Sequence, residues 1–166
     1  MTKCYPWHYK NSMCLMGDAA HAIVPFYGQG MNAGFEDCTY LNALLEEHHD
    51  DFDKVLPEYT RLRKPAGDAI LQLALNNYIE MRDKTADKDF LLQKRIENRF
   101  STKHPSLWKS LYEQVSFSHT PYQDALQNGY DQQKLMDKVM AVEGIESKWD
   151  SDEVEEQMLQ LIGAHK

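Results

Sequence analysis

The chain has 166 residues, the length of about one domain, and its 42% hydrophobic and 27% charged residues are ordinary proportions for a soluble globular protein. A formal net charge of −8 argues against nucleic-acid binding, because phosphate recognition needs clustered lysine and arginine. The sequence shows neither a secretory leader pattern nor about 18 consecutive apolar residues, so we expect a cytoplasmic protein without a membrane span.

The three cysteines, Cys4, Cys14 and Cys38, are odd in number and lack the spacing of metal ligands. Two of them lie in or beside apolar stretches, which is typical of buried free thiols in a reducing compartment. We therefore expect neither a disulfide framework nor a metal site.

The N-terminal residues predict a small sheet. Residues 2–17 read as two short strands with a turn at Lys10 and Asn11 between them. The apolar run 13–16 is typical of a buried strand, and it ends in Gly17-Asp18, where a carboxylate can face a ligand.

Helical spacing of apolar residues dominates the rest of the chain. It predicts helices over 31–47, 52–82, 87–99, 105–115 and 122–142, and a last one that opens at Ser151. We expect a kink or restart at Pro65–Gly67 and a weak point at Asn128-Gly129. The predicted fold class is mainly α with a short β remnant, divided into residues 1–47 and a helical domain over 48–166.

The loop before the first long helix carries Gly28 and Gly30, which let backbone approach a flat ligand closely. The helix that follows near Met31 offers free N–H groups and the positive end of its dipole, which favours negative charge. Strand, Gly-Asp, glycine loop and helix in this order indicate a cofactor site.

The string from Gly17 to Asp37, GDAAHAIVPFYGQGMNAGFED, resembles the second flavin-binding motif of the FAD-dependent aromatic hydroxylases. The resemblance continues through Arg61–Arg63, Asn77–Arg82 and Leu111-Tyr112, about three quarters of the chain. It implies a flavoprotein monooxygenase with FAD as cofactor, NADPH as co-substrate, and O2 and a small aromatic molecule as substrates.

The resemblance assigns the cofactor contacts to this motif. Asp18 would bind the ribityl chain of FAD, and Gly28 and Gly30 would admit the ring. The backbone N–H groups of Met31 and Asn32 would face the ring edge that becomes negative on reduction. The plainer alternatives are that Asp18 caps the next turn and that Met31 and Asn32 are an ordinary helix start.

Substrate contacts follow from the same resemblance. Pro25 and Phe26 would lie beside the reacting face of the flavin, where hydroxylation needs a dry cavity. Asn77 and Tyr112 would bind the carboxylate of an amino-acid substrate, and Met81, four residues after Asn77, would line the ring pocket. Loop packing, a solvated asparagine and a core tyrosine remain the alternatives from the residues alone.

No catalytic side chain is expected in this segment. His21 is better explained by capping or packing than by base catalysis. The run His48–Asp51 could suggest metal, but consecutive residues on one turn point in different directions, so a solvated loop is the better interpretation.

None of the eight glycines forms a GxGxxG turn, which the family uses over the FAD pyrophosphate. We therefore expect the C-terminal part of an α/β FAD-dependent monooxygenase, whose N-terminal Rossmann-type half is missing here and could be a partner. Exposed apolar surface is expected around residues 13–45. Two alternatives stay open: a related hydroxylase with another aromatic substrate, and a non-catalytic helical module that does not retain FAD.

Overall fold

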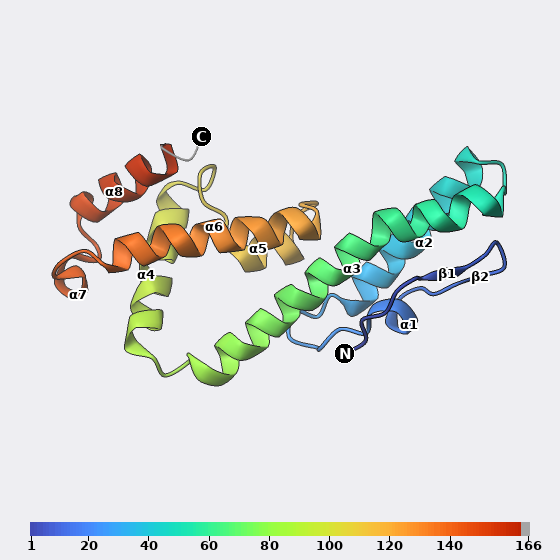
Figure 1. The fold of residues 1–166 in the computed structure, drawn as a ribbon. Coiled ribbons are helices and arrows are strands. Elements are labelled where there is room, and N and C mark those ends of the chain that lie inside the picture. Colours follow the sequence, from blue (N-terminus) through green and yellow to red (C-terminus); the bar gives the residue numbers. More distant parts are fainter. Residues whose placement is uncertain (164–166) are drawn as a thin grey trace. The chain divides into compact units, whose positions relative to one another are not determined.

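The computed structural model describes residues 1–163, and it is mostly helical with one two-stranded sheet (Figure 1), which confirms the coarse fold class. The elements in chain order are β1 (His8–Tyr9), β2 (Met13–Cys14), α1 (Asp18–His21), α2 (Gly30–Glu47), α3 (Phe52–Asp83), α4 (Lys88–Lys103), α5 (Leu111–Ser116), α6 (Tyr122–Met140), α7 (Ile145–Lys148) and α8 (Asp152–Gly163). None of these helices is both long and apolar enough to cross a membrane.

The described residues form two compact units. The first contains residues 1–78 and 121–126, and the second contains 79–120 together with the residues from 127 onward. These units are defined by contacts along the chain and do not test the expected boundary at residue 47. That boundary, between a flavin-binding piece and a helical domain, stays a prediction.

The predicted hairpin is present: β1 and β2 are antiparallel, and His8 pairs with Cys14 across the turn. The prediction that 13–16 forms a buried strand is wrong, because Met13 is 63% and Leu15 is 38% exposed. The sheet has only these two strands among the described residues, and the paired residues Tyr9 and Met13 are 60% and 63% exposed.

Helices α2 and α3 form an antiparallel pair within the first unit (Figure 1), joined by the turn at 48–51. The expected restart at Pro65–Gly67 does not occur, since α3 runs without interruption past Pro57 and Pro65. Proline removes one helical N–H and displaces the carbonyl four residues earlier. Pro65 and Arg61 are both exposed, so water can satisfy the carbonyl that Pro65 frees.

The core of the first unit lies between the hairpin, α1, α2 and the first half of α3. Its fully buried residues are Trp7, Ala20, Leu44, Val55, Leu56 and Tyr59. Tyr59 also donates a hydrogen bond from its hydroxyl to the Leu15 carbonyl at 3.3 Å, which ties α3 to the chain after β2. The chain that leads to the turn at Gly17 is therefore anchored to this core.

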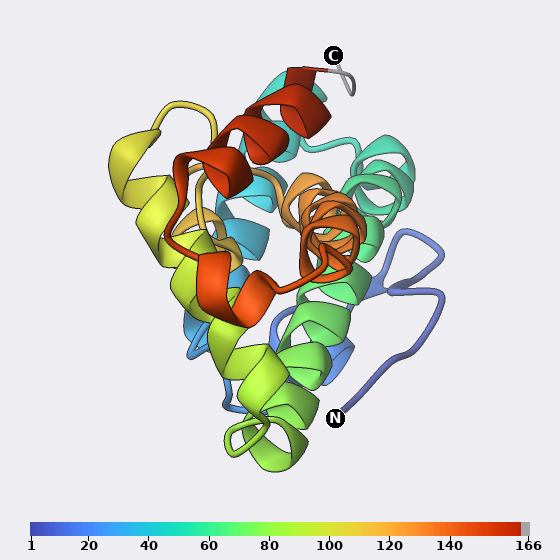
Figure 2. The same cartoon turned by 90° about the vertical axis from the view of Figure 1, so that its left-hand side faces the viewer.

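The second unit packs α4, α6 and α8 around one apolar cluster (Figure 2). Its buried members are Ile96, Phe100, Trp108, Leu135, Met136, Val139, Ile145, Val154 and Met158. Asp87 caps α4, accepting the Phe90 N–H at 2.9 Å. The weak point predicted at Asn128-Gly129 leaves α6 unbroken.

One helix start in this unit was predicted wrongly. Residues 105–107 form a turn, and α5 begins only at Leu111, where the Ser110 hydroxyl accepts the Glu113 N–H at 3.2 Å. Proline at 105 suits a first helical position, but the chain at Pro105 turns once and leaves the helical path. The short helix α7 was not predicted.

Candidate functional site

The Gly-Asp turn opens helix α1. Gly17 precedes the helix with φ 53° and ψ −136°, a conformation that only glycine adopts without strain. A Cβ there would lie 3.9 Å from the Gly34 Cα, so the turn also passes close to α2.

Asp18 is the first residue of α1 and is exposed. The capping position is occupied by Gly17, which has no side chain, and the Asp18 carboxylate makes no hydrogen bond or ion pair within residues 1–163. The alternative that Asp18 caps the turn is therefore not what the structure shows. Its carboxylate remains available to a ligand.

A buried cluster of charged and polar side chains is hydrogen-bonded to this turn. Asp37 of α2 is fully buried and accepts three hydrogen bonds, from the Gly17 N–H at 3.0 Å, from His21 Nε2 at 2.5 Å and from Arg63 Nε at 2.8 Å. Arg63 also donates to the Ala33 carbonyl at 3.3 Å. The carboxylate thus fixes α1, α2 and α3 to one another at the Gly-Asp turn.

The electrostatics of the cluster favour an ionised Asp37. Burial by itself raises the pKa of this carboxyl, but the hydrogen bonds from His21, Arg63 and Gly17 outweigh it and hold the pKa below its usual value. The second nitrogen of His21, Nδ1, has no partner within the described residues. His21 hydrogen-bonds to Asp37 through Nε2 and packs against Trp7, as the packing interpretation predicted.

The glycine loop leaves open space where a flat ligand would approach. Gly28 has φ 67°, and a Cβ built on Gly28 or on Gly30 would have nothing within 4 Å. Helix α2 begins at Gly30 without a side-chain cap, because the Gln29 carboxamide oxygen accepts from the Asn32 side chain at 2.9 Å instead. The first-turn N–H groups near Met31 and Asn32 are thus left for a ligand, and both residues are exposed.

Two of the predicted substrate-side residues meet in the structure. Asn77 of α3 donates from Nδ2 to the Phe26 carbonyl at 2.7 Å. The next residue, Tyr78, stacks on the Phe26 ring with centroids 4.6 Å apart. Pro25 is exposed, and Phe26 is half-buried. The structure therefore brings Phe26 and Asn77 together, and Asn77 is not simply solvated.

The other two substrate-side residues belong to the second unit. Met81 is 53% and Tyr112 is 55% exposed, so Tyr112 is not a core residue. The Tyr112 ring packs edge-on against Phe117 with centroids 5.9 Å apart. Their roles in substrate binding stay predictions.

Sequence reasoning missed the part of Asp37 and Arg63 in the site. A signal existed: Asp37 lies four residues after Ala33 and seven before Leu44, both buried positions of α2. Arg63 likewise follows Tyr59 and precedes Ala66 on the buried face of α3. Charged residues in register with core positions indicate a buried ion pair.

The apolar surface expected around residues 13–45 is present. Five large apolar side chains of this stretch are more than a third exposed: Met13, Leu15, Met31, Phe35 and Tyr40. No group of three or more metal-ligating side chains with suitable geometry occurs in the described part of the chain.

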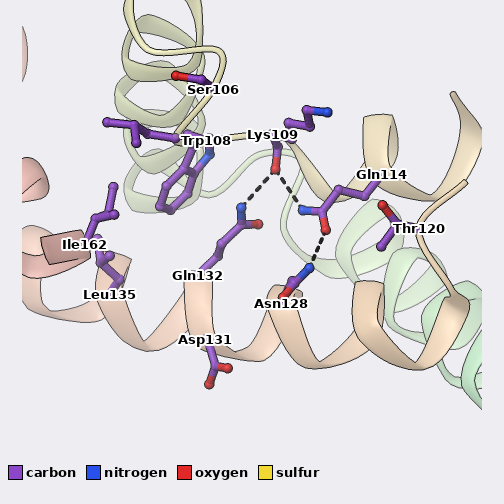
Figure 3. A pocket seen from close by; sticks show the side chains of 11 residues that line it. Ser106, Trp108, Lys109, Gln114, Thr120, Asn128, Asp131, Gln132, Leu135 and Ile162 are labelled. Atoms are coloured by element: carbon purple, nitrogen blue, oxygen red, sulfur yellow. Dashed lines mark hydrogen bonds between the residues drawn. The ribbon is translucent and has the colours of Figure 1, made fainter. Parts of the chain in front are cut away.

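A separate cavity of about 410 Å³ lies in the second unit (Figure 3). The Lys109 carbonyl accepts from the Gln132 carboxamide at 2.8 Å and from Gln114 at 2.9 Å, and Asn128 donates to the Gln114 oxygen at 2.8 Å. Two of the carboxamides on its wall thus bind the Lys109 main chain, and the third binds another carboxamide. None of the predicted site residues lines this cavity.

Comparison with known proteins agrees with the motif. Residues 4–74 match a family model described as FAD binding domain, which supports FAD as the cofactor. Proteins named kynurenine 3-monooxygenase are 53% identical in Christiangramia forsetii and 52% identical in Flavobacterium johnsoniae, each over 160 residues and 96% of this chain. The protein of that name from Anopheles gambiae is 44% identical over 140 residues, 84% of the chain.

The predicted resemblance to FAD-dependent aromatic hydroxylases is thereby confirmed. The chain spans about a third of the length of these relatives, 36% for the two bacterial proteins and 29% for the insect one. The similarity therefore concerns a portion of a flavoprotein monooxygenase.

Proposed function

We propose, from its similarity to kynurenine 3-monooxygenases, that this chain is the C-terminal portion of an enzyme that hydroxylates L-kynurenine to 3-hydroxykynurenine. The complete enzyme would use FAD, NADPH and O2, and its product would enter the kynurenine pathway toward NAD. The Rossmann-type N-terminal half would come from outside this stretch. The observation that carries the proposal is one motif that combines an unpaired Asp18, the open Gly28–Gly30 loop and an uncapped helix start.

The residues of the first unit fit the flavin. Asp18 has a free carboxylate, which can accept hydrogen bonds from the vicinal hydroxyls of the ribityl chain. The N–H groups at the start of α2 suit the ring edge on which reduction places negative charge. When bound, FAD would supply the activated oxygen for hydroxylation after its reduction by NADPH.

The chain's own contribution to the chemistry would be positioning and the exclusion of water. Pro25 and Phe26 offer apolar surface beside the flavin face, which lowers the access of water to the reaction. Asn77 retains one N–H that would donate to a substrate carboxylate, and the Tyr112 hydroxyl would donate to it as well. Met81 would line the pocket of the aromatic ring.

A chimera tests the proposal directly. This chain would replace the 160 matched residues of the Christiangramia forsetii protein, with the unaltered relative as positive control. We expect the purified chimera to retain FAD and to oxidise NADPH faster when L-kynurenine is added. Asp18→Ala should lower the flavin content, whereas Asp50→Ala, an exposed carboxylate in the 48–51 turn, should not.

The outcomes separate the alternatives. A folded chimera without flavin would overturn the cofactor assignment and favour the non-catalytic module. A flavin-loaded chimera whose NADPH oxidation ignores L-kynurenine would overturn the substrate and favour another aromatic hydroxylase. In the active chimera, Asn77→Ala and Tyr112→Phe should each raise the KM for kynurenine more than they lower kcat, because both groups would bind the non-reacting carboxylate.

A further inference from the structure

The glycine loop between α1 and α2 is attached to α3 through Phe26. Phe26 is held there twice by consecutive residues, through its carbonyl by Asn77 at 2.7 Å and through its ring by Tyr78 at 4.6 Å between centroids. Its N–H donates to the Val24 carbonyl at 2.8 Å, so the loop is turned tightly where α3 contacts it.

We propose that Asn77 is a positioning residue for this loop, in addition to its proposed contact with substrate. One N–H of its carboxamide fixes the Phe26 carbonyl, and Phe26 lies between the exposed Pro25 and the open position at Gly28. Helix α3 thereby determines where the loop stands relative to the space in front of Gly28 and Gly30.

The consequence for the flavin rests on the proposed function. A carboxylate that accepts the second Asn77 N–H would hold the carboxamide in the orientation in which its first N–H points at the Phe26 carbonyl. The same side chain would then link the occupied substrate site to the order of the loop at the flavin face. A mobile loop would admit water to that face, so the bond favours productive hydroxylation.

The attachment can be tested on the chain as it stands, by amide hydrogen exchange at residue resolution. In Asn77→Asp at pH 7 the ionised carboxylate cannot donate to the Phe26 carbonyl. We expect the Phe26 N–H to exchange about five times faster than in the unmodified chain, the effect of losing one ordinary hydrogen bond. At pH 4 the protonated carboxyl can donate again, and exchange should return to within about twofold of the unmodified chain at that pH.

Asn76→Asp is the matched control, because Asn76 lies on the same turn of α3 and only accepts from Gln72. It should leave Phe26 exchange unchanged at both pH values. The proposal would be overturned if Asn77→Asp left the exchange unchanged at pH 7, or if the increase persisted at pH 4. An equal increase throughout α2 and α3 would overturn it as well. If the aspartate variant does not fold, Asn77→Ala supplies the pH 7 comparison. The measurement needs no flavin, so its result is independent of the chimera.

Discussion

The cores of the two units are built differently. Behind the Gly-Asp turn, the first unit buries an aspartate, an arginine and a histidine in one hydrogen-bonded cluster. The second unit buries an apolar cluster around α4, α6 and α8, with its ion pairs at the surface, such as Lys94 with Glu97. Hydrogen bonds have direction, whereas apolar packing depends mainly on volume. The unit for which we propose a ligand-binding turn is thus the unit that buries charged side chains.

Removing the arginine of the buried cluster should have the largest effect on the free energy of unfolding. Arg63→Ala would leave the fully buried Asp37 without its cation, and we expect a loss of about 3–5 kcal/mol in the free energy of unfolding, measured with urea. Arg61→Ala is the control on the same helix, since Arg61 is 67% exposed and pairs only with Glu58. It should change the free energy by less than about 0.5 kcal/mol. Equal losses in the two variants would show that the cluster adds no stability.

Acid should weaken the first unit through the same carboxylate. Because the folded-state pKa of Asp37 lies below its unfolded value, its contribution is present above the unfolded pKa and is lost as pH falls through the folded pKa. At pH values below about 4, we expect the urea concentration at the unfolding midpoint to decrease. The loss in free energy of unfolding should be smaller than that of Arg63→Ala, because protonated Asp37 can still accept hydrogen bonds. Asp37→Asn should flatten this dependence, and an unchanged acid slope in that variant would assign the loss to other carboxylates.

Substituting one glycine in each unit compares how much room the neighbouring side chains leave for a Cβ. A Cβ on Gly67 would lie 2.6 Å from the buried Trp7 ring, which cannot turn away, so Gly67→Ala should cost about 1–3 kcal/mol. A Cβ on Gly129 would meet the end of the Leu111 side chain at 2.9 Å, and leucine can change rotamer. Alanine also gains about 1 kcal/mol of helix propensity, so Gly129→Ala should be nearly neutral. A comparable loss at both positions, measured by urea unfolding, would show that the contact between Gly129 and Leu111 is equally rigid.

Much of the fold could be predicted because local chemistry determines it. The turn at Lys10-Asn11, the cap at Asp87 and the apolar spacing of α2, α4 and α6 are readable from neighbours in the sequence. The uninterrupted α3 could not be read in this way. Whether proline at 65 breaks a helix depends on water reaching the carbonyl of Arg61, which is a property of the folded surface.

The site was predictable where a motif carries it and not where it depends on long-range contacts. Asp18, Gly28 and Gly30 stand in one motif, and the structure leaves all three accessible. The bond from Asn77 to Phe26 joins residues 51 positions apart, and that from Arg63 to Asp37 spans 26. Spacing along the chain marks Asp37 and Arg63 as buried positions but does not say which residues pair, so resemblance could suggest a role for Asn77 but not its partner.

The smallest expected effect concerns the helix start that the sequence placed too early. The Ser110 hydroxyl accepts the Glu113 N–H and caps α5, so Ser110→Ala should cost about 1 kcal/mol and reduce the helical signal slightly. Ser106 lies in the turn after Pro105 and is exposed, and a helix that began at Pro105 would place it inside the first turn and not at the cap. Ser106→Ala should therefore be nearly neutral in thermal unfolding. No loss at Ser110 would mean that its hydroxyl does not determine where α5 starts, and would leave that to the packing of α5 against α6 through Leu111 and Gly129.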